Sequence, residues 1–303
     1  MSNHGTSSKT FLITGATAGI GRATALYLAK RGYRVIASGR NQVALDELAR
    51  EGQGLDLHIV RLDVTDVASI ASARVEVDRI TQGRGLDGLV NNAGYGLAAA
   101  VLEVTDADLR AQMEVNVFGL MAVTRAFAAQ MIDRRAGRIV NISSVGGRVT
   151  FPMFGAYHAS KYAVEALSNA LRMELAPFGV GVTVVEPGPI RSDFGARSVQ
   201  ELSKYRRPES PYVAVYDRAE AVEAMAAKMS ADPVVVCKVI ERGLVARRPA
   251  ARYVVPFSSS VMLWFMERMP TRVLDFVNAR FLGLTRSRLL GGAPTPAALP
   301  QNG

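Results

Sequence analysis

The sequence predicts an α/β protein built on a single, doubly wound parallel sheet, with helices on both faces and a C-terminal helical extension. Short apolar segments alternate with segments of helical periodicity over roughly the first 190 residues, an order typical of parallel sheets covered on both faces. Glycines also cluster between the first apolar segment and the first helical one, which marks a tight strand-to-helix connection.

The elements follow one another from the N-terminus. Apolar runs bounded by turn residues predict six strands, over residues 11–14, 34–38, 57–62, 86–90, 137–142 and 180–185. Helical periodicity predicts helices over residues 20–31, 42–50 and 68–80. Asp66 is expected to cap the last of these helices. Residues 195–232 are polar and contain Pro208 and Pro211, which predicts a loop-and-helix insertion, and residues 252–256 are a candidate final strand.

The composition is that of an ordinary globular protein of 303 residues, 49% hydrophobic and 21% charged. Its only cysteine, Cys237, excludes an intrachain disulfide and is expected to be a small buried hydrophobe. The polar N-terminus lacks the basic-then-apolar order of a secretory signal, and no uninterrupted apolar run approaches the ~18–20 residues of a membrane span. We therefore expect a cytoplasmic protein, at most peripheral at a membrane surface.

The first turn carries Gly15, Gly19 and Gly21 within the segment Thr14–Gly21. Glycine permits the positive φ of a tight turn and a close approach of the backbone to a ligand. The N-terminus of the following helix offers free amides and the positive end of the helix dipole, which suit a pyrophosphate. The spacing G-x-x-x-G-x-G differs from the G-x-G-x-x-G fingerprint. The prediction of a dinucleotide site therefore rests on the Rossmann-like context of strand, turn and helix.

Arg40 follows the second predicted strand. A carboxylate at this position would bind the adenosine ribose and repel a 2′-phosphate. A guanidinium holds a phosphate in bidentate fashion, so we expect NADP(H) as the preferred cofactor, with NAD(H) as the alternative. Arg40 has a second interpretation, as a solvated residue at a helix start. Asp63 ends the third predicted strand, where it is expected to meet the adenine or to cap the next helix.

Tyr157 and Lys161 stand i, i+4 apart in a helical segment, so a phenol and an ammonium share one face of a helix. A phenol has a reference pKa of about 10, and a neighbouring cation is expected to lower it. Such a pair is suited to exchange a proton with an alcohol or carbonyl oxygen. His158 is the next residue on the helix, points about 100° away, and is expected to be structural or substrate-facing.

These segments together resemble the short-chain dehydrogenase/reductase family, in its main, non-extended branch, over about residues 9–193. The resemblance is carried by the turn Thr14–Gly21, by Asn91-Asn92-Ala93-Gly94, by Asn116 in Val-Asn-Val-Phe-Gly, and by Ser144, thirteen residues before Tyr157. It extends to the segment from Pro187 to Ser192, where serine replaces the family's usual threonine. Ala18 stands where relatives that prefer NADP often carry a basic residue.

The resemblance implies a catalytic tetrad of Asn116, Ser144, Tyr157 and Lys161, with Ser143 as the alternative serine. Tyr157 would give a proton to a carbonyl oxygen that Ser144 holds. Lys161 would lower the tyrosine pKa and bind the nicotinamide ribose, and Asn116 would hold a water linked to Lys161. The resemblance also implies cofactor contacts at Gly15, Thr17, Gly19, Ile20, Gly21, Arg40, Asp63, Val64, Asn91, Ala93, Gly94, Tyr157, Lys161, Pro187, Gly188, Ile190 and Ser192.

The implied function is that of an NADP(H)-dependent oxidoreductase that interconverts a carbonyl and a secondary or primary alcohol. The C-terminal third resembles longer family members that act on steroids, retinoids and other lipid-like compounds, so we expect a hydrophobic substrate. The alternatives are a 3-oxoacyl-thioester reductase and a non-catalytic cofactor-binding regulator, which the complete tetrad disfavours. His4 and His58 lack partners at metal-ligand spacing, so no metal site is expected. The resemblance further implies a homodimer or homotetramer formed through the two long helices after strands four and five.

The stretch from Arg242 to Gly292 carries nine arginines and only two acidic residues. Such a concentration suits an acidic ligand or an anionic membrane surface. Aromatic residues do not interleave with the basic ones, so we expect no nucleic-acid partner. The apolar run Val261–Met266 has three interpretations: helices that line an apolar substrate pocket, an oligomer interface, or an interfacial anchor that makes peripheral membrane contact through residues 258–290.

We therefore expect a single domain over residues 1–303. Residues 9–193 would form the dinucleotide-binding and catalytic core, and residues 194–290 the substrate pocket and the C-terminal helical extension. Residues 291–303, rich in glycine, proline and alanine, are expected to be a disordered tail.

Overall fold

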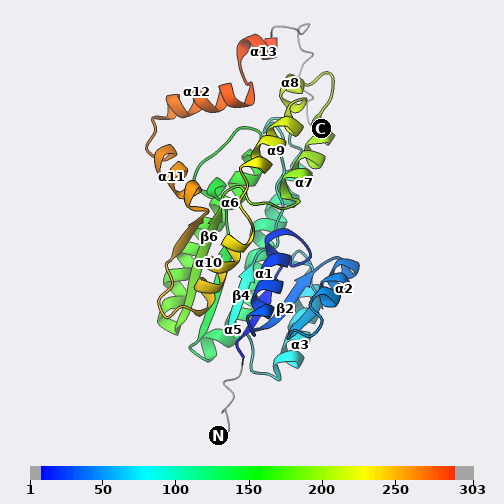
Figure 1. Ribbon diagram of the computed structural model, residues 1–303, viewed down its shortest axis with the longest axis vertical. Coiled ribbons are helices and arrows are strands. Elements are labelled where there is room, and N and C mark those ends of the chain that lie inside the picture. The colour runs from blue at the N-terminus through cyan, green and yellow to red at the C-terminus, as the bar shows by residue number, and fades with distance from the viewer. Residues whose placement is uncertain (1–7, 291–303) are drawn as a thin grey trace.

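The computed structural model describes residues 8–290 and is organised around one seven-stranded sheet whose strands all run parallel (Figure 1). In spatial order the strands are β3 (Leu57–Arg61), β2 (Arg34–Gly39), β1 (Thr10–Ile13), β4 (Gly88–Asn91), β5 (Gly137–Ile142), β6 (Val180–Pro187) and β7 (Arg252–Val255). The chain begins in the middle, winds outward to β3 and then crosses to β4. This reversal creates a crevice at the carboxyl ends of β1 and β4, where ligands bind in such sheets.

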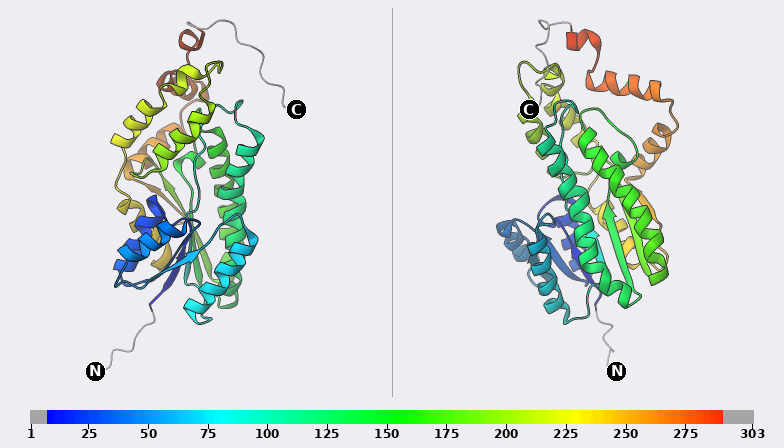
Figure 2. Two further views of the ribbon diagram at one scale, coloured as in Figure 1. Left: turned by 90° about the vertical axis from the view of Figure 1, so that its right-hand side faces the viewer. Right: turned by 180° about the vertical axis from the view of Figure 1, so that it is seen from behind.

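Helices cover both faces of the sheet, which Figure 2 (left) shows between two layers. One layer contains α1 (Gly19–Lys30), α2 (Gln42–Glu51) and α10 (Val234–Val245), and the other contains α3 (Val67–Thr81), α5 (Leu120–Asp133) and α6 (Gly155–Leu175). Alternate residues of β1 supply the two cores, because Phe11 and Ile13 join the first layer whereas Leu12 joins the second. The predicted doubly wound parallel sheet is confirmed.

Polar side chains cap the N-termini of α2 and α3. The side chain of Asp66 accepts a hydrogen bond from the Ala68 N–H at 2.9 Å and caps α3, as expected. Asn41 caps α2 in the same way. The start of α1 is different, because its N-cap residue is Ala18 and, in the described chain, no side chain caps it. The first amides of α1 therefore remain available to a ligand.

One helix runs from Asp106 to Asp133 as α4 (Asp106–Met113), a π-helical turn η1 (Glu114–Gly119) and α5. By length and composition it is apolar enough to cross a membrane, although half of its most apolar window is buried in the protein. The helix has no uninterrupted apolar run of this length, because charged residues such as Glu114 and Arg125 interrupt it. The apolar side chains that raise its hydropathy, among them Val123 and Phe127, pack onto the sheet.

The C-terminal third adds helices at the carboxyl end of the sheet (Figure 1). The predicted insertion consists of α7 (Phe194–Leu202), α8 (Val213–Tyr216) and α9 (Ala219–Lys228), and the candidate final strand is β7. Three further helices follow, α11 (Phe257–Met266), α12 (Thr271–Leu282) and α13 (Arg286–Leu290). The expected disordered tail, 291–303, and His4 lie outside the described residues.

Candidate active site

The Tyr157 side chain lies near the carboxyl edge of the sheet, in the first turn of α6. Ser144, two residues after the end of β5, lies close enough to the Tyr157 hydroxyl to influence its pKa. Ser144 is fixed in turn, because its Oγ accepts a hydrogen bond from the Gly146 N–H at 3.0 Å and caps the short helix η2 (Val145–Gly147). Two separate elements therefore bring the sequence-predicted tyrosine and serine together.

Burial raises the pKa of Tyr157 to about 12, and the nearby Ser144 hydroxyl offsets only part of that rise. This corrects the expectation that Lys161 lowers the pKa. The ammonium lies 5.8 Å from the centre of the tyrosine ring, and removal of the phenolate from water dominates. A phenol with this pKa is protonated at neutral pH.

Lys161 is buried beside the same site, one helical turn after Tyr157. Its ammonium donates a hydrogen bond to the carbonyl oxygen of Ile142, the last residue of β5, at 2.9 Å. Burial lowers the pKa of Lys161 to about 8, while the carboxylate of Glu165 acts in the opposite direction. A lysine with this pKa is still mostly protonated at neutral pH. The site therefore contains one buried positive charge.

Asn116 lies in the π-helical turn η1, a departure from α-helical geometry that is frequent at functional sites. Its amide nitrogen donates to the Tyr95 carbonyl at 3.0 Å and to the Ser160 hydroxyl at 2.9 Å, and its oxygen accepts from the Tyr95 N–H at 3.1 Å. Both amide hydrogens are thus used within the protein. Gly94 separates Asn116 from Lys161, since a Cβ at that glycine would lie 3.0 Å from Asn116 Oδ1 and 3.8 Å from Lys161 Nζ.

Two neighbouring residues have other positions. Ser143 is buried, and its hydroxyl has no hydrogen-bond partner in the described chain, so the structure brings Ser144 rather than Ser143 to Tyr157. His158 has both ring nitrogens engaged by backbone groups, Nδ1 with the Gly146 carbonyl at 2.8 Å and Nε2 with the Phe151 N–H at 3.3 Å. Burial lowers its pKa, so His158 is a neutral side chain that fixes the loop after η2.

The glycine turn lies at the crevice between β1 and β4. Gly15 and Gly19 have φ values of 65° and 53°, which glycine adopts without strain. A Cβ at Gly21 would lie 2.3 Å from the Gly15 carbonyl oxygen, so the helix can approach the turn only because this residue is glycine. Next to the turn, Thr17 packs against Gly39 at the end of β2, and Ile20 packs on the α1 side of the core.

Asn92 and Thr14 hold this turn against the segment after β4, a role that the sequence did not assign to either. The Asn92 amide donates to the carbonyls of Thr14 and Gly15 at 2.9 and 3.0 Å. The Thr14 hydroxyl accepts from the backbone N–H groups of Asn92 and Ala93, both at 3.0 Å. A Cβ at Gly15 would lie 2.7 Å from Ala93 Cα. Through Ala93 and Gly94, the turn lies close to Lys161.

The segment after β6 closes the crevice from the other side. A Cβ at Gly19 would lie 3.4 Å from Ser192 Cβ, so the glycine turn and this segment face each other across a narrow gap. The Pro187 carbonyl accepts a hydrogen bond from Ser144 at 3.4 Å, and Ile190 forms a parallel bridge with Ala231. Gly188 lies against Ser259 of α11.

Several residues were predicted to contact the adenosine half of the cofactor, and their side chains do not all face the crevice. The Arg40 side chain is 71% exposed, and its guanidinium lies 4.0 Å from the carboxylate of Asp63. Val64 is buried against Gly119 of η1. The side chain of Asn91 is also buried, where it donates to Thr124 and Asn141 at 2.9 Å each. Asn91 therefore joins β4 to α5 and β5 through its side chain.

Two aromatic rings, those of Phe194 and Phe154, lie next to the ring of Tyr157. The ring centre of Phe194, at the start of α7, lies 5.5 Å from that of Tyr157, and the centre of Phe154 lies 6.5 Å away. Beyond them lies an apolar cluster. It includes Leu97, Met153, Leu202, Tyr205 and Tyr216. Sequence periodicity does not reveal this environment, because it depends on how the insertion folds back over residues 95–100.

A network of ion pairs lies behind Lys161. Arg252 of β7 pairs with Glu165 of α6 at 2.6 Å and contacts Glu186 of β6. Arg148, just after η2, lies 3.5 Å from Glu186 and also pairs with Glu267, at the end of α11. Burial raises the pKa of Glu186 to about 7, helped by Glu165 and opposed by the two arginines. Through Arg148, the network joins the segment after η2 to the C-terminal helices.

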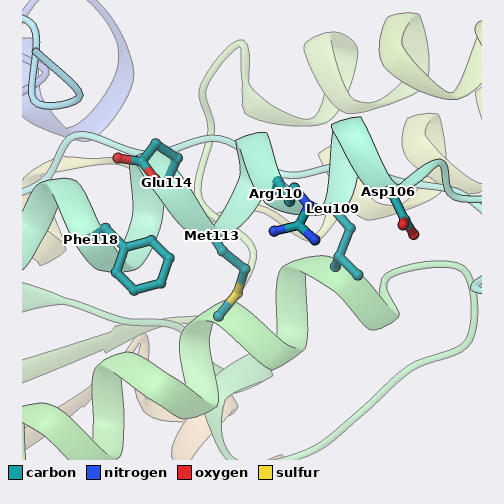
Figure 3. A pocket seen from close by; sticks show the side chains of 6 residues that line it. All are labelled: Asp106, Leu109, Arg110, Met113, Glu114 and Phe118. Atoms are coloured by element: carbon teal, nitrogen blue, oxygen red, sulfur yellow. The ribbon is translucent and has the colours of Figure 1, made fainter.

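A surface cavity of about 440 Å³ lies elsewhere, on the outer side of the long helix (Figure 3). Its lining comes from α4 and η1, namely Asp106, Leu109, Arg110, Met113, Glu114 and Phe118. Phe118 is exposed there, whereas Asn116 is buried toward Lys161, so the cavity and the candidate active site lie on different faces of η1.

Comparison with known proteins identifies this arrangement. The family model described as short chain dehydrogenase matches residues 9–203. The chain belongs to this family. Retinol dehydrogenase 16 of Homo sapiens is 36% identical over 282 residues, which cover 89% of this chain and 87% of the human protein. The NADPH-dependent 3-dehydrocapnine reductase of Ornithobacterium rhinotracheale is 31% identical over 268 residues, 87% of this chain and 94% of that protein.

The solved structures agree. A short-chain dehydrogenase from Streptomyces avermitilis superposes with a TM-score of 0.69 at 31% identity and covers 92% of this chain and 96% of its own. Membership of the short-chain dehydrogenase family makes the protein an oxidoreductase that uses a nicotinamide cofactor, as the sequence predicted. The uncapped start of α1 and the glycines that leave room beside it fit a dinucleotide at this crevice.

Proposed function

We propose that this short-chain dehydrogenase is an NADP(H)-dependent enzyme that interconverts a carbonyl and an alcohol on a hydrophobic substrate, with Tyr157 as the proton donor for reduction. The observation that carries the proposal is the position of the Ser144 hydroxyl next to the Tyr157 hydroxyl, beside the buried ammonium of Lys161. A proton donor, an oxygen-binding hydroxyl and a positive charge are what carbonyl reduction requires of a protein.

The cofactor would lie across the crevice, and its nicotinamide would supply or accept the hydride. The free amides at the start of α1 would bind the pyrophosphate. Gly94 leaves space next to Lys161, so the ammonium would meet the nicotinamide ribose. The segment from Pro187 to Ser192 would face the carboxamide. Arg40 is exposed and only weakly paired with Asp63, so its guanidinium is free to bind a 2′-phosphate.

The side chains divide the proton chemistry among them. In the reductive direction the Tyr157 hydroxyl gives its proton to the carbonyl oxygen, and the Ser144 hydroxyl donates a hydrogen bond to the same oxygen. The Lys161 ammonium, 5.8 Å from the centre of the tyrosine ring, binds the nicotinamide ribose. Asn116 acts as a positioning residue, because its amide fixes Tyr95 and Ser160, which flank Gly94 and Lys161 in the chain. The Asn116 amide nitrogen has no hydrogen left to donate, so the water expected next to Lys161 would have to bind a different group.

The proposed substrate class rests on the apolar surroundings of Tyr157. The rings of Phe154 and Phe194 flank its hydroxyl-bearing ring, and a buried apolar cluster lies behind them. A relative at 36% identity is named for retinol, a long apolar alcohol. Long-chain, retinoid and steroid carbonyls are therefore the first compounds to assay, with a 3-oxoacyl thioester as the competing class.

The substitution Tyr157→Phe removes the proposed proton donor and keeps the ring. We expect turnover of a hydrophobic ketone or aldehyde to fall by about 10³-fold, within the range for loss of general acid catalysis. The Kd for NADPH, measured by fluorescence titration, should change by less than about twofold because the hydroxyl is not needed to bind the pyrophosphate. The matched control is Tyr162→Phe on the same helix. Turnover retained in Tyr157→Phe would refute the assigned role.

The substitution Arg40→Ser tests the preference for NADP(H). We expect the KM for NADPH to rise by about tenfold or more, since a charge-assisted hydrogen bond to phosphate contributes roughly 1.5–3 kcal/mol. The KM for NADH should change little because NADH has no 2′-phosphate. Arg50→Ser, on the neighbouring helix α2, is the control. Equal changes for the two cofactors would show that Arg40 does not recognise the phosphate.

We also propose a homodimer or homotetramer formed through the outer faces of the long helix and α6. The cavity of Figure 3 and a second one of about 280 Å³ lie there, lined in part by Met121, Ala129 and Leu171. Phe118→Glu places a charge on this face and should shift the sedimentation coefficient of the wild-type oligomer toward that of a smaller species. Phe178→Glu is the control. A wild-type protein that sediments as a monomer would contradict the proposal.

A further inference from the structure

One side of helix α11 is buried against the protein, and the other side is exposed to solvent. Ser259 and Leu263 are buried against the body of the protein. The opposite side exposes Phe257, Trp264 and Phe265, with 81%, 52% and 58% of their surface accessible. Such large aromatic surfaces are costly to leave in water, so an exposed row of them marks a contact surface.

The next helix, α12, continues this apolar surface. Within α12, which the structure describes in full, no side chain is buried. Val273, Phe276, Val277 and Phe281 recur at helical spacing and are all exposed, Phe276 to 65% and Phe281 to 52%. A helix whose whole apolar stripe is exposed gains little from packing within its own chain. Figures 1 and 2 show that α11 and α12 project beyond the sheet, at the end where α7 to α9 also lie.

Positive charge surrounds the same surface. The arginines of α11 to α13 and their connections are all exposed, namely Arg268, Arg272, Arg280, Arg286 and Arg288. Only two carboxylates belong to this stretch, and Glu267 is already paired with Arg148. The guanidinium of Arg268 stacks on the ring of Trp264, 4.3 Å from its centre. Apolar aromatic residues and arginines therefore share one surface.

We propose that α11 and α12 form a docking surface for an anionic phospholipid bilayer, with the aromatic residues at the acyl boundary and the arginines at the headgroups. This combination of a bare apolar stripe and flanking cations is the signature of interfacial helices. A second copy of the chain is a poor occupant, because a self-complementary contact would bring two arginine-rich faces together. An acidic bilayer matches both the apolar and the charged parts of the surface.

The surface is continuous with the candidate active site. Gly188, in the segment predicted to contact the nicotinamide, lies against Ser259 of α11. Arg148, just after η2, pairs with Glu267 at the end of the same helix. A hydrophobic substrate dissolved in the bilayer would thus meet the protein close to Tyr157. This last point rests on the proposed function, whereas the docking itself does not.

The test measures vesicle binding of the full-length protein without substrate or cofactor. Vesicles of phosphatidylcholine, with or without phosphatidylglycerol, are sedimented, and the bound fraction is determined. We expect binding to the vesicles that contain phosphatidylglycerol and a decrease in binding as salt is raised. The variant with Phe276→Ser and Phe281→Ser should bind at least about tenfold more weakly. Its matched control is Phe178→Ser, an exposed phenylalanine on the turn between α6 and β6.

The charge is tested separately with Arg272→Gln and Arg280→Gln together, which should weaken binding to anionic vesicles about tenfold and leave binding to neutral vesicles little changed. Arg242→Gln on α10 is the control. The proposal is wrong if the wild-type protein binds neither kind of vesicle, or if the paired phenylalanine variant binds as tightly as the wild type. Because no turnover is measured, either result leaves the proposed reaction untouched.

Discussion

The candidate site depends on one buried hydrogen bond, from the ammonium of Lys161 to the carbonyl of Ile142. This bond fixes α6 against the carboxyl end of β5 at a single register. Tyr157 precedes Lys161 by one turn, and Ser144 follows Ile142 by two residues, so the same register brings the two hydroxyls together. A shift of α6 by one residue would turn Tyr157 away by about 100°. The position of the Tyr157 hydroxyl is therefore a consequence of helix-to-strand packing.

Burial has opposite effects on the two ionisable groups of this pair. It raises the pKa of Tyr157 to about 12 and lowers that of Lys161 to about 8. In both cases burial favours the neutral form over the charged form, as expected for groups removed from water. The result suits reduction, because the phenol holds its proton at neutral pH while the lysine keeps most of its charge. Alcohol oxidation would need the phenolate, which becomes more populated as the pH rises toward the pKa of Tyr157.

The sequence predicted the sheet well because both faces of a parallel sheet are buried, and its strands are short apolar runs bounded by turns. Ser144 and Tyr157, which the sequence singled out, do lie next to each other in the structure, and their part in the chemistry stays a prediction. The sequence did not predict the sign of the tyrosine pKa shift, which depends on how deeply α6 buries Tyr157. It did not distinguish Asn91, buried in the core, from Asn92, which holds the turn. Both belong to one motif, and only tertiary contacts separate them.

The central claim is that burial keeps the Tyr157 hydroxyl protonated in the cofactor-free enzyme. The direct measurement is a spectrophotometric pH titration of phenolate absorbance, recorded for the wild type and for Tyr157→Phe without cofactor. The difference between the two curves reports Tyr157 alone. With a pKa near 12, we expect no phenolate from Tyr157 below about pH 10, the pKa of an unperturbed phenol. A midpoint in the difference curve near neutral pH would contradict it.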